Sequence, residues 1–261
     1  MNSRTHTGGM GASQRRIIAI GDIHGCRDAL CRLLDKLAYG AEDTLVFLGD
    51  YCDRGPDTPG VVTRLLELQA AHAHCVFLRG NHDAMLLHFL ALQPAGDGDA
   101  FTLACNGGLQ TLQQYGCPNE LLRQCPEGRL PSDDIRRALA DCICAEHREF
   151  FMATRPLHVT RHYVFAHAGI NPQRTLATQT HNDLFWVREE FIAMPHTLPQ
   201  VVIYGHTPTY DLDWRPRDDR ENRKIGVDTG AVYGGFLTAL ILPQMDFVQV
   251  PGFTQEEGLK R

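Results

Sequence analysis

The first third of the chain alternates short apolar runs with segments of helical periodicity. Three runs rich in β-branched and other apolar residues predict buried strands, at 16–20, 44–49 and 74–79. Three segments with apolar residues at helical spacing predict helices, at 27–38, 59–71 and 83–92. Because strands and helices alternate, we expect a parallel sheet joined by right-handed crossovers.

The pattern changes over about 93–155, where helix-like stretches are separated by polar loops. Within it, 133–154 is typical of one long helix, and we interpret the whole segment as a helical insertion. Short strands separated by turn residues then return, in LHVT, HYVFAHAG, VVIYGHT, KIGVDTG, FLTALIL and DFVQV. They predict a second, more mixed sheet packed on the first.

The composition narrows the class of protein, its partners and its cellular compartment. Of 261 residues, 43% are apolar and 21% charged, as in packed proteins, and we expect a flexible tail at 1–14 and a single domain at 15–261. The net charge of −6 does not indicate a nucleic acid or an anionic membrane as partner, and no run of about 18 apolar residues could span a bilayer. The start lacks a secretory signal and the nine cysteines form no C-x-x-C pair, which predicts a reduced, cytoplasmic protein of undetermined oligomeric state.

Each of the first three predicted strands ends in a glycine-containing turn with polar side chains. The turns read Gly-Asp-Ile-His-Gly at 21–25, Gly-Asp-Tyr-Cys-Asp-Arg-Gly at 49–55 and Gly-Asn-His-Asp at 80–83. One such turn alone is unremarkable, since Gly, Asp and Asn are common turn residues. However, the carboxyl ends of parallel strands meet at one sheet edge. We therefore expect five side chains to converge there, those of Asp22, His24, Asp50, Asn81 and His82.

Two more histidines, His167 and His206, end apolar runs in the same way. The donor set then comprises carboxylates, imidazoles and one amide, without a thiolate. Such oxygen and nitrogen ligands suit manganese, iron or zinc, and two ions sharing a carboxylate are a standard device for cleaving phosphoesters.

The motifs GDIHG, GDYCDRG, GNHD, HAG and YGHT, in this order, resemble those of the calcineurin-like metallophosphoesterases. The GDxxDRG form resembles the PPP-type serine/threonine protein phosphatases, particularly the bacterial and phage branch, as do DLFWVREEF at 183–191 and VDTGAVYGGFLTAL at 227–240. The resemblance implies an α/β fold of two packed mixed β-sheets flanked by helices, the metallophosphoesterase sandwich, with the helical insertion at about 93–155.

The resemblance also implies a role for each site residue. It implies two divalent ions, with manganese preferred and iron or zinc as alternatives, held by Asp22, His24, Asp50, Asn81, His167 and His206. Asp50 would bridge the two ions. Arg54, Arg188 and His82 would contact the substrate phosphate, and Asp53 would orient His82. Asp83 and Cys52 depart from the Glu and Val that the family often has there, and neither position is a ligand in the family.

Chemically, two cations would lower the pKa of a shared water, and the resulting hydroxide would attack phosphorus while His82 protonates the leaving oxygen. We expect a serine/threonine protein phosphatase acting on a phosphorylated protein or peptide. The alternative is a diadenosine tetraphosphate or other nucleotide hydrolase, and a third reading is a phosphoprotein-binding module with an inactive site. For the nucleotide alternative, the insertion offers four candidate residues to stack on adenine, Phe101, Tyr115, Phe150 and Phe151. Their spacing fits helix packing at least as well.

Overall fold

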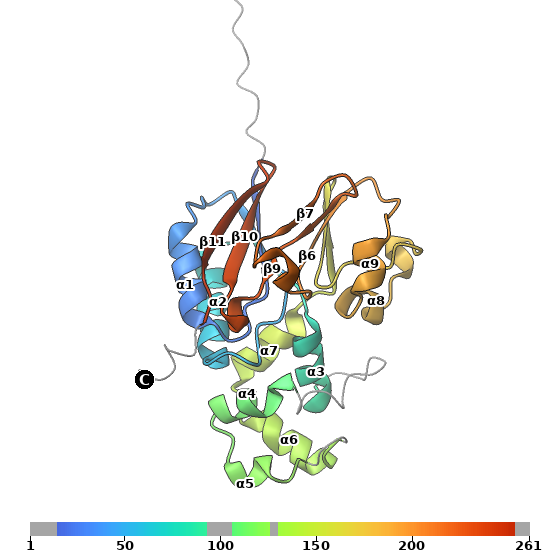
Figure 1. Cartoon of the computed structure of the whole chain (residues 1–261). Helices are drawn as coiled ribbons and strands as arrows, with labels where there is room; N and C mark the ends of the chain where they lie inside the picture. Colours follow the sequence, from blue (N-terminus) through green and yellow to red (C-terminus); the bar gives the residue numbers. More distant parts are fainter. Residues whose placement is uncertain (1–14, 93–105, 126–129, 254–261) are drawn as a thin grey trace, which may run out of the picture.

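Two β-sheets pack face to face in the computed structural model, which describes residues 15–92, 106–125 and 130–253. Figure 1 shows the sheets side by side, with helices on their outer sides and a group of helices below them. Apolar side chains from both sheets fill the space between them, among them Ala19, Val46, Phe165, Ile203 and Leu240. The predicted fold class, two packed mixed sheets flanked by helices, is confirmed.

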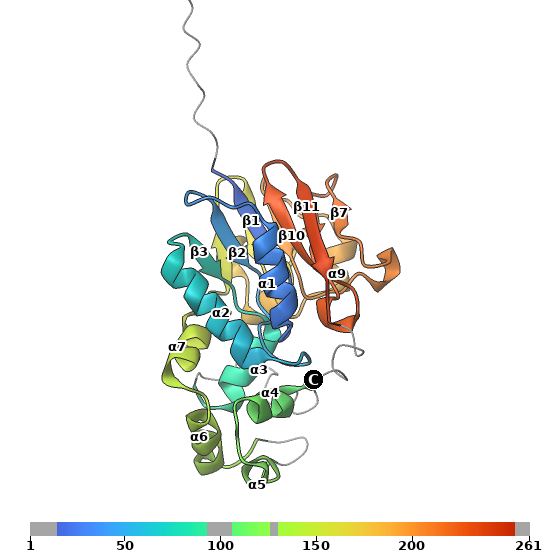
Figure 2. The ribbon, with the colours of Figure 1, turned by 90° about the vertical axis from the view of Figure 1, so that its left-hand side faces the viewer.

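The first sheet has the strand order β11-β10-β1-β2-β3, with β9 paired to β10. Its strands are β1 (Ile17–Ile20), β2 (Thr44–Phe47), β3 (Cys75–Phe77), β9 (Asp228–Thr229), β10 (Phe236–Leu242) and β11 (Asp246–Pro251). The three N-terminal strands are parallel, as their alternation with helices predicted, whereas β10 runs antiparallel to β1. Helices α1 (Arg27–Lys36) and α2 (Thr58–Ala71) lie across the outer face of this sheet (Figure 2).

The second sheet has the order β4-β5-β6-β8-β7 and is mixed. Its strands are β4 (Leu157–Val159), β5 (Tyr163–Ala166), β6 (Val201–Tyr204), β7 (Arg217–Asp219) and β8 (Lys224–Gly226). Side chains alternate along β5, so that Phe165 faces the other sheet and Val164 faces outward. The outward face is covered by two short helices, α8 (His181–Phe185) and α9 (Glu189–Ala193).

The helices below the sheets come from the predicted insertion and from the helix predicted at 83–92, just before it (Figure 1). They are α3 (Asn81–Phe89), α4 (Gly108–Gln114), α5 (Asn119–Leu122), α6 (Asp133–Asp141) and α7 (Ala145–Ala153). The prediction of one long helix over 133–154 was wrong, because the chain turns between α6 and α7. Arg148 stabilises this turn by donating hydrogen bonds to the carbonyls of Ala140 and Ile143, at 2.8 and 3.0 Å. The apolar periodicity continues through the turn, since Ile143 is buried, and it therefore concealed the break.

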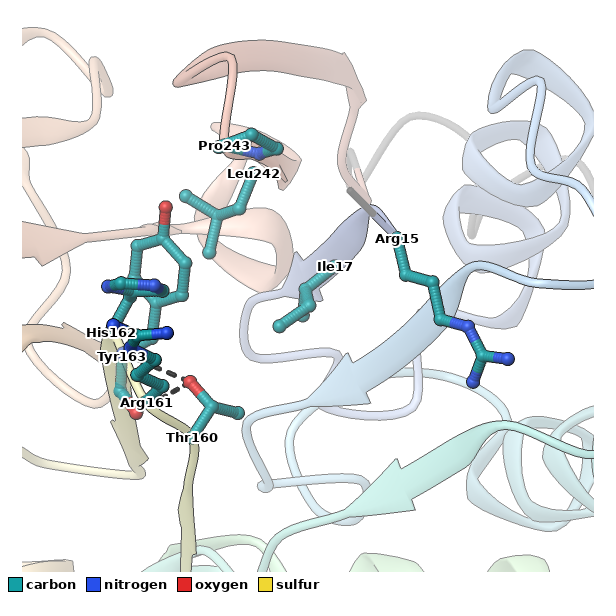
Figure 3. A pocket seen from close by; sticks show the side chains of 8 residues that line it. All are labelled: Arg15, Ile17, Thr160, Arg161, His162, Tyr163, Leu242 and Pro243. Atoms are coloured by element: carbon teal, nitrogen blue, oxygen red, sulfur yellow. Dashed lines mark hydrogen bonds between the residues drawn. The ribbon is translucent and has the colours of Figure 1, made fainter. Parts of the chain in front are cut away.

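A pocket lies at the end of the sheets where the parallel strands begin (Figure 3). It is lined by the start of β1, the β4–β5 turn and the end of β10, including Ile17, Thr160 and Leu242. The predicted functional residues lie at the opposite ends of these strands. No helix within the described ranges is long and apolar enough to cross a membrane. The predicted tail at 1–14 lies outside the described residues, and the division into tail and domain stays a prediction.

Candidate active site

The turns that follow β1, β2, β3, β5 and β6 bring the predicted ligand residues together in the interior. Eight side chains from these turns are each at most 4% exposed, namely Asp22, His24, Asp50, Asp53, Asn81, His82, His167 and His206. The convergence expected at the carboxyl edge of a parallel sheet therefore occurs, and it involves both sheets.

Glycines in these turns let carboxylates pack directly on the backbone. A Cβ atom at Gly80 would lie 2.0 Å from Asp50 Oδ1, and one at Gly205 would lie 2.0 Å from Asp22 Oδ1. Any larger residue would displace a carboxylate that the site requires. The glycines are thus needed for close approach.

Two groups of potential metal ligands share Asp50. One contains His24, Asp50 and His82, the other Asp50, His167 and His206, and within each group the ligand atoms lie within 4.8 Å of one another. Asp50 Oδ2 lies 3.4 Å from His24 Nε2 and 3.5 Å from His167 Nε2. This position between the groups is the one that a bridging carboxylate requires.

Asn81 joins the second group through its side-chain oxygen. Its Oδ1 lies 2.9 Å from both His167 Nε2 and His206 Nδ1. His167 Nδ1 donates to the Leu48 carbonyl, so a neutral His167 presents a lone pair at Nε2. Asn81 Oδ1 and His167 Nε2 are then both acceptors, and a cation bound by both atoms would account for their close approach. In addition, His206 Nε2 is buried and has no hydrogen-bond partner among the described residues.

The electrostatics of the site fit divalent cations. Burial lowers the pKa values of His24, His167 and His206, which keeps these imidazoles neutral, the form that binds metal. Burial and the charges of Asp228 and Asp50 raise the pKa of Asp22 well above its ordinary value. Bound cations would remove this excess of buried negative charge.

Asp22 lies at the site but outside both ligand groups. Its carboxylate accepts hydrogen bonds from the backbone N–H of His206, at 3.0 and 3.2 Å. Asp22 therefore also fixes the turn that carries His206.

Asp53 and His82 form the predicted pair, with 2.7 Å between Asp53 Oδ2 and His82 Nδ1. The geometry alone is compatible with two roles, a proton donor or a metal ligand oriented by a carboxylate, because His82 also belongs to a ligand group. Sequence reasoning missed the third member, Thr111 of α4. Its hydroxyl donates to Asp53 Oδ1 at 2.6 Å and accepts from the Asp53 backbone N–H at 3.0 Å.

The two predicted phosphate-binding arginines differ in position. Arg54 Nη1 lies 2.7 Å from His24 Nε2, so this guanidinium reaches the ligand group itself. Arg188 lies just before α9 and is exposed, and its charge contributes to lowering the pKa values of His167 and His206. Arg188 thus lies at the rim of the site, on the side of the second sheet.

Two buried aspartates also escaped sequence reasoning. Asp228 is 5% exposed, and burial together with the charge of Asp50 raises its pKa to about 7. It lies two residues after the strand glycine Gly226, whereas Asp22 directly follows a glycine, so its sequence signal is weaker. Asp83 accepts hydrogen bonds from the backbone N–H groups of Asp50, Tyr51 and Gly80, at 2.8, 3.0 and 2.8 Å. It therefore locks two ligand-bearing turns together.

Of the four aromatic candidates for stacking on adenine, the three within the described residues pack in the helical segment or the core. Phe150 and Phe151 are buried in the core, 5% and 1% exposed. Tyr115 is half-buried, and its hydroxyl lies 2.9 Å from His147 Nδ1. Phe101 lies outside the described residues. The apolar periodicity of this segment therefore reflects packing of α7 against the core.

Comparisons with known proteins identify the family. The model of the family described as calcineurin-like phosphoesterase matches residues 15–234. The asymmetrical bis(5′-nucleosyl)-tetraphosphatase PrpE of Halalkalibacterium halodurans is 28% identical over 258 residues, with 89% of this chain and 92% of that protein covered. Serine/threonine-protein phosphatase 1 of Salmonella typhimurium is 30% identical over 230 residues, with 86% and 90% covered.

A crystal structure suggested to be that of a diadenosine tetraphosphatase superposes with a TM-score of 0.64 at 25% identity. The match covers 93% of this chain and 96% of that one. The family model covers most of the chain, including the helical segment, and the chain belongs to the calcineurin-like phosphoesterase family.

Proposed function

We propose that the protein hydrolyses dinucleoside polyphosphates of the diadenosine tetraphosphate class, with two divalent metal ions and manganese preferred. The observation that carries this proposal is the near-complete match to relatives and a solved structure with such names, which includes the helical segment. It reverses the ranking expected from the GDYCDRG loop, which favoured a protein phosphatase.

The proposed ligands are Asp22, His24, Asp50, Asn81, His167 and His206. When bound, two divalent cations supply positive charge for the phosphates and lower the pKa of a bound water. Arg54 and Arg188 bind phosphate oxygens, because a guanidinium matches their geometry with two donors. His82, held by Asp53, donates a proton to the bridging oxygen as it leaves, a contribution that a phosphate leaving group needs less than a serine alkoxide does. One water is consumed, and asymmetrical cleavage of diadenosine tetraphosphate yields ATP and AMP.

A serine/threonine protein phosphatase is the second candidate. The relative of that name is 30% identical over most of both chains, and the same site would accept a phosphoserine or phosphothreonine. The two substrates differ in their leaving group. A serine alkoxide needs a proton to leave, whereas a phosphate group leaves more readily without one.

A substrate panel separates the candidates. Manganese-loaded protein is assayed with diadenosine tetraphosphate and with several serine and threonine phosphopeptides, and the nucleotide products are separated by chromatography. We expect kcat/KM for diadenosine tetraphosphate to exceed that for every phosphopeptide, with ATP and AMP as products. A phosphopeptide with the higher kcat/KM would reject the proposal in favour of the protein phosphatase.

A further inference from the structure

Three aromatic side chains lie together on the surface beside the active site. Tyr210 is 58% exposed and Tyr233 is 40% exposed, whereas Trp214 is half-buried. The ring centroid of Tyr210 lies 4.7 Å from that of Trp214 and 5.7 Å from that of Tyr233. Single exposed aromatic residues are common on protein surfaces, whereas contiguous exposed apolar surface marks interaction sites. We call Tyr210, Trp214 and Tyr233 the aromatic cluster.

The aromatic cluster is anchored to Asp228. The backbone N–H of Thr209 donates to the Asp228 carbonyl at 3.3 Å, which fixes the chain just before Tyr210. The N–H of Gly230 donates to Asp228 Oδ1 at 3.0 Å, which fixes the turn that leads to Tyr233. Both tyrosines therefore have a fixed position relative to the buried carboxylates.

Bare glycine backbone supports the tryptophan ring. A Cβ atom at Gly230 would lie 2.1 Å from Trp214 Cζ3, and one at Gly235 would lie 2.8 Å from Trp214 Cδ2. The indole thus packs flat on the chain between β9 and β10 and, in turn, supports Tyr210. A cluster that is ordered in advance loses little entropy when a planar ligand binds.

The aromatic cluster borders the phosphate-binding arginines. Arg54 Cζ lies 5.6 Å from the centroid of the Tyr233 ring. Burial and the charge of Asp228 raise the pKa of Tyr210, while the charges of Arg54 and Arg188 oppose this increase. Tyr210 therefore lies within the field of both arginines. A phosphate bound at Arg54 would therefore lie beside the Tyr233 ring.

We propose that the aromatic cluster binds the nucleobase of a nucleotide whose phosphate lies at Arg54. The base stacks on Tyr210, and Tyr233, whose ring is inclined at 47° to that of Tyr210, borders it. This inference rests on the proposed dinucleoside polyphosphatase activity and adds a specificity site to it. Every nucleobase presents a flat π-face, so such a site suits nucleotides in general. A serine or threonine phosphopeptide has no ring at a fixed distance from its phosphate and would leave these tyrosines without a partner.

The test compares two ligands that differ only in the base. Dissociation constants of AMP and ribose 5-phosphate are measured by calorimetry on the manganese-loaded protein. We expect AMP to bind about 5- to 150-fold more tightly, as base stacking on aromatic side chains contributes elsewhere. Tyr210→Leu should remove most of this ratio, and Tyr210→Phe, which keeps the ring, should retain it. Tyr39→Leu, the same change at a tyrosine that packs on His72, should leave the ratio at the wild-type value.

The base site and the proposed function can be rejected independently of each other, the first by the binding ratio and the second by the substrate panel. Equal affinities for AMP and ribose 5-phosphate, or an unchanged ratio in Tyr210→Leu, would overturn the base site even if diadenosine tetraphosphate is cleaved. A ratio that depends on Tyr210 in a protein that cleaves only phosphopeptides would support the base site and reject the proposed function. Tyr210 is the informative position, because Tyr233 also contacts Arg54 and its loss would affect phosphate binding.

Discussion

The buried ligand edge and the exposed rim of the site are built in different ways. At the ligand edge, side chains such as Asp50 and His167 lie directly after strands and are almost completely buried. At the rim, Arg188, Tyr210 and Tyr233 lie at the ends of helices of three to five residues and are exposed. One region is fixed by sheet hydrogen bonds, the other by local turns that contact Asp228.

This difference corresponds to two chemical requirements. Metal ligands must hold their geometry within a few tenths of an ångström, and rigid turns at strand ends provide that precision. Substrate contacts must distinguish one leaving group or base from another, and residues on short surface helices can change without disturbing the metals. Family membership is therefore visible at the ligand edge, whereas substrate choice is expected to depend on the rim.

Asp50→Asn should have the largest effect, because the substitution removes a charge shared by both ligand groups. We expect a loss of kcat beyond the roughly 10²–10⁴-fold that a positioned proton donor contributes. Bound manganese, measured by plasma mass spectrometry, should fall as well. Asp134→Asn, at an exposed carboxylate of α6, is the control and should alter neither. Near-native turnover with both ions retained would contradict the bridging role.

His82→Ala should come next, and it separates the two roles that the geometry allows. As a proton donor, His82 should be dispensable for metal binding, and its loss should lower kcat by roughly 10²–10⁴-fold on phosphopeptides. The loss should be smaller on diadenosine tetraphosphate and on p-nitrophenyl phosphate, whose leaving groups hardly need a proton. Reduced manganese content, or equal losses on all three substrates, would instead identify His82 as a metal ligand.

The sequence predicted the ligand edge well because one rule covers it. A buried strand followed by glycine and a polar residue identified Asp22, Asp50 and Asn81, and parallel topology implied their convergence. Asp228 does not follow this rule, because Val227 separates it from Gly226. The strand positions were similarly accessible, since burial on both faces leaves an apolar run.

The helical segment and the rim were harder to predict for physical reasons. A threonine on a helix face, such as Thr111, carries no local signal of the carboxylate that it contacts 58 residues away. The sequence around the aromatic residues of α7 does not distinguish them from those of the rim. They differ in burial, since Phe151 is buried and Tyr210 is exposed. Tertiary contacts determine whether such a residue is buried or exposed, and the periodicity of a single sequence carries no information about these contacts.

Thr111→Val should have an intermediate effect that links the helical segment to the ligand edge. The change keeps the shape of the side chain but removes the hydroxyl bonded to Asp53, so the carboxylate orients His82 less well. We expect kcat to fall about 10-fold, the equivalent of a hydrogen bond of roughly 1.4 kcal/mol to a charged group. The loss should be larger on phosphopeptides than on p-nitrophenyl phosphate, and Thr111→Ser should restore the rate. A uniform loss that serine does not restore would mean that Thr111 acts only in packing.

Asp183→Ala should have the smallest effect, confined to the stability of the rim. Asp183 accepts hydrogen bonds from the backbone N–H and hydroxyl of Thr180 at the start of α8, at 2.8 and 2.7 Å. Its removal should lower the free energy of unfolding by about 1 kcal/mol, as loss of a helix cap does. Burial alone would raise the pKa of Asp183, but the hydrogen bonds from Thr180 and the charge of Arg174 lower it below 3.8.

Because the folded pKa of Asp183 is depressed, its ionised form stabilises the protein above the unfolded pKa, and this contribution disappears as the pH falls through the folded value. Urea unfolding should therefore show the full difference between Asp183→Ala and wild type at pH 7 and a smaller one at pH 3. Manganese content should remain unchanged, since α8 provides no ligand to the metal site. Loss of manganese in this variant would show that the rim and the ligand edge are not independent, and it would remove the basis for assigning substrate choice to the rim alone.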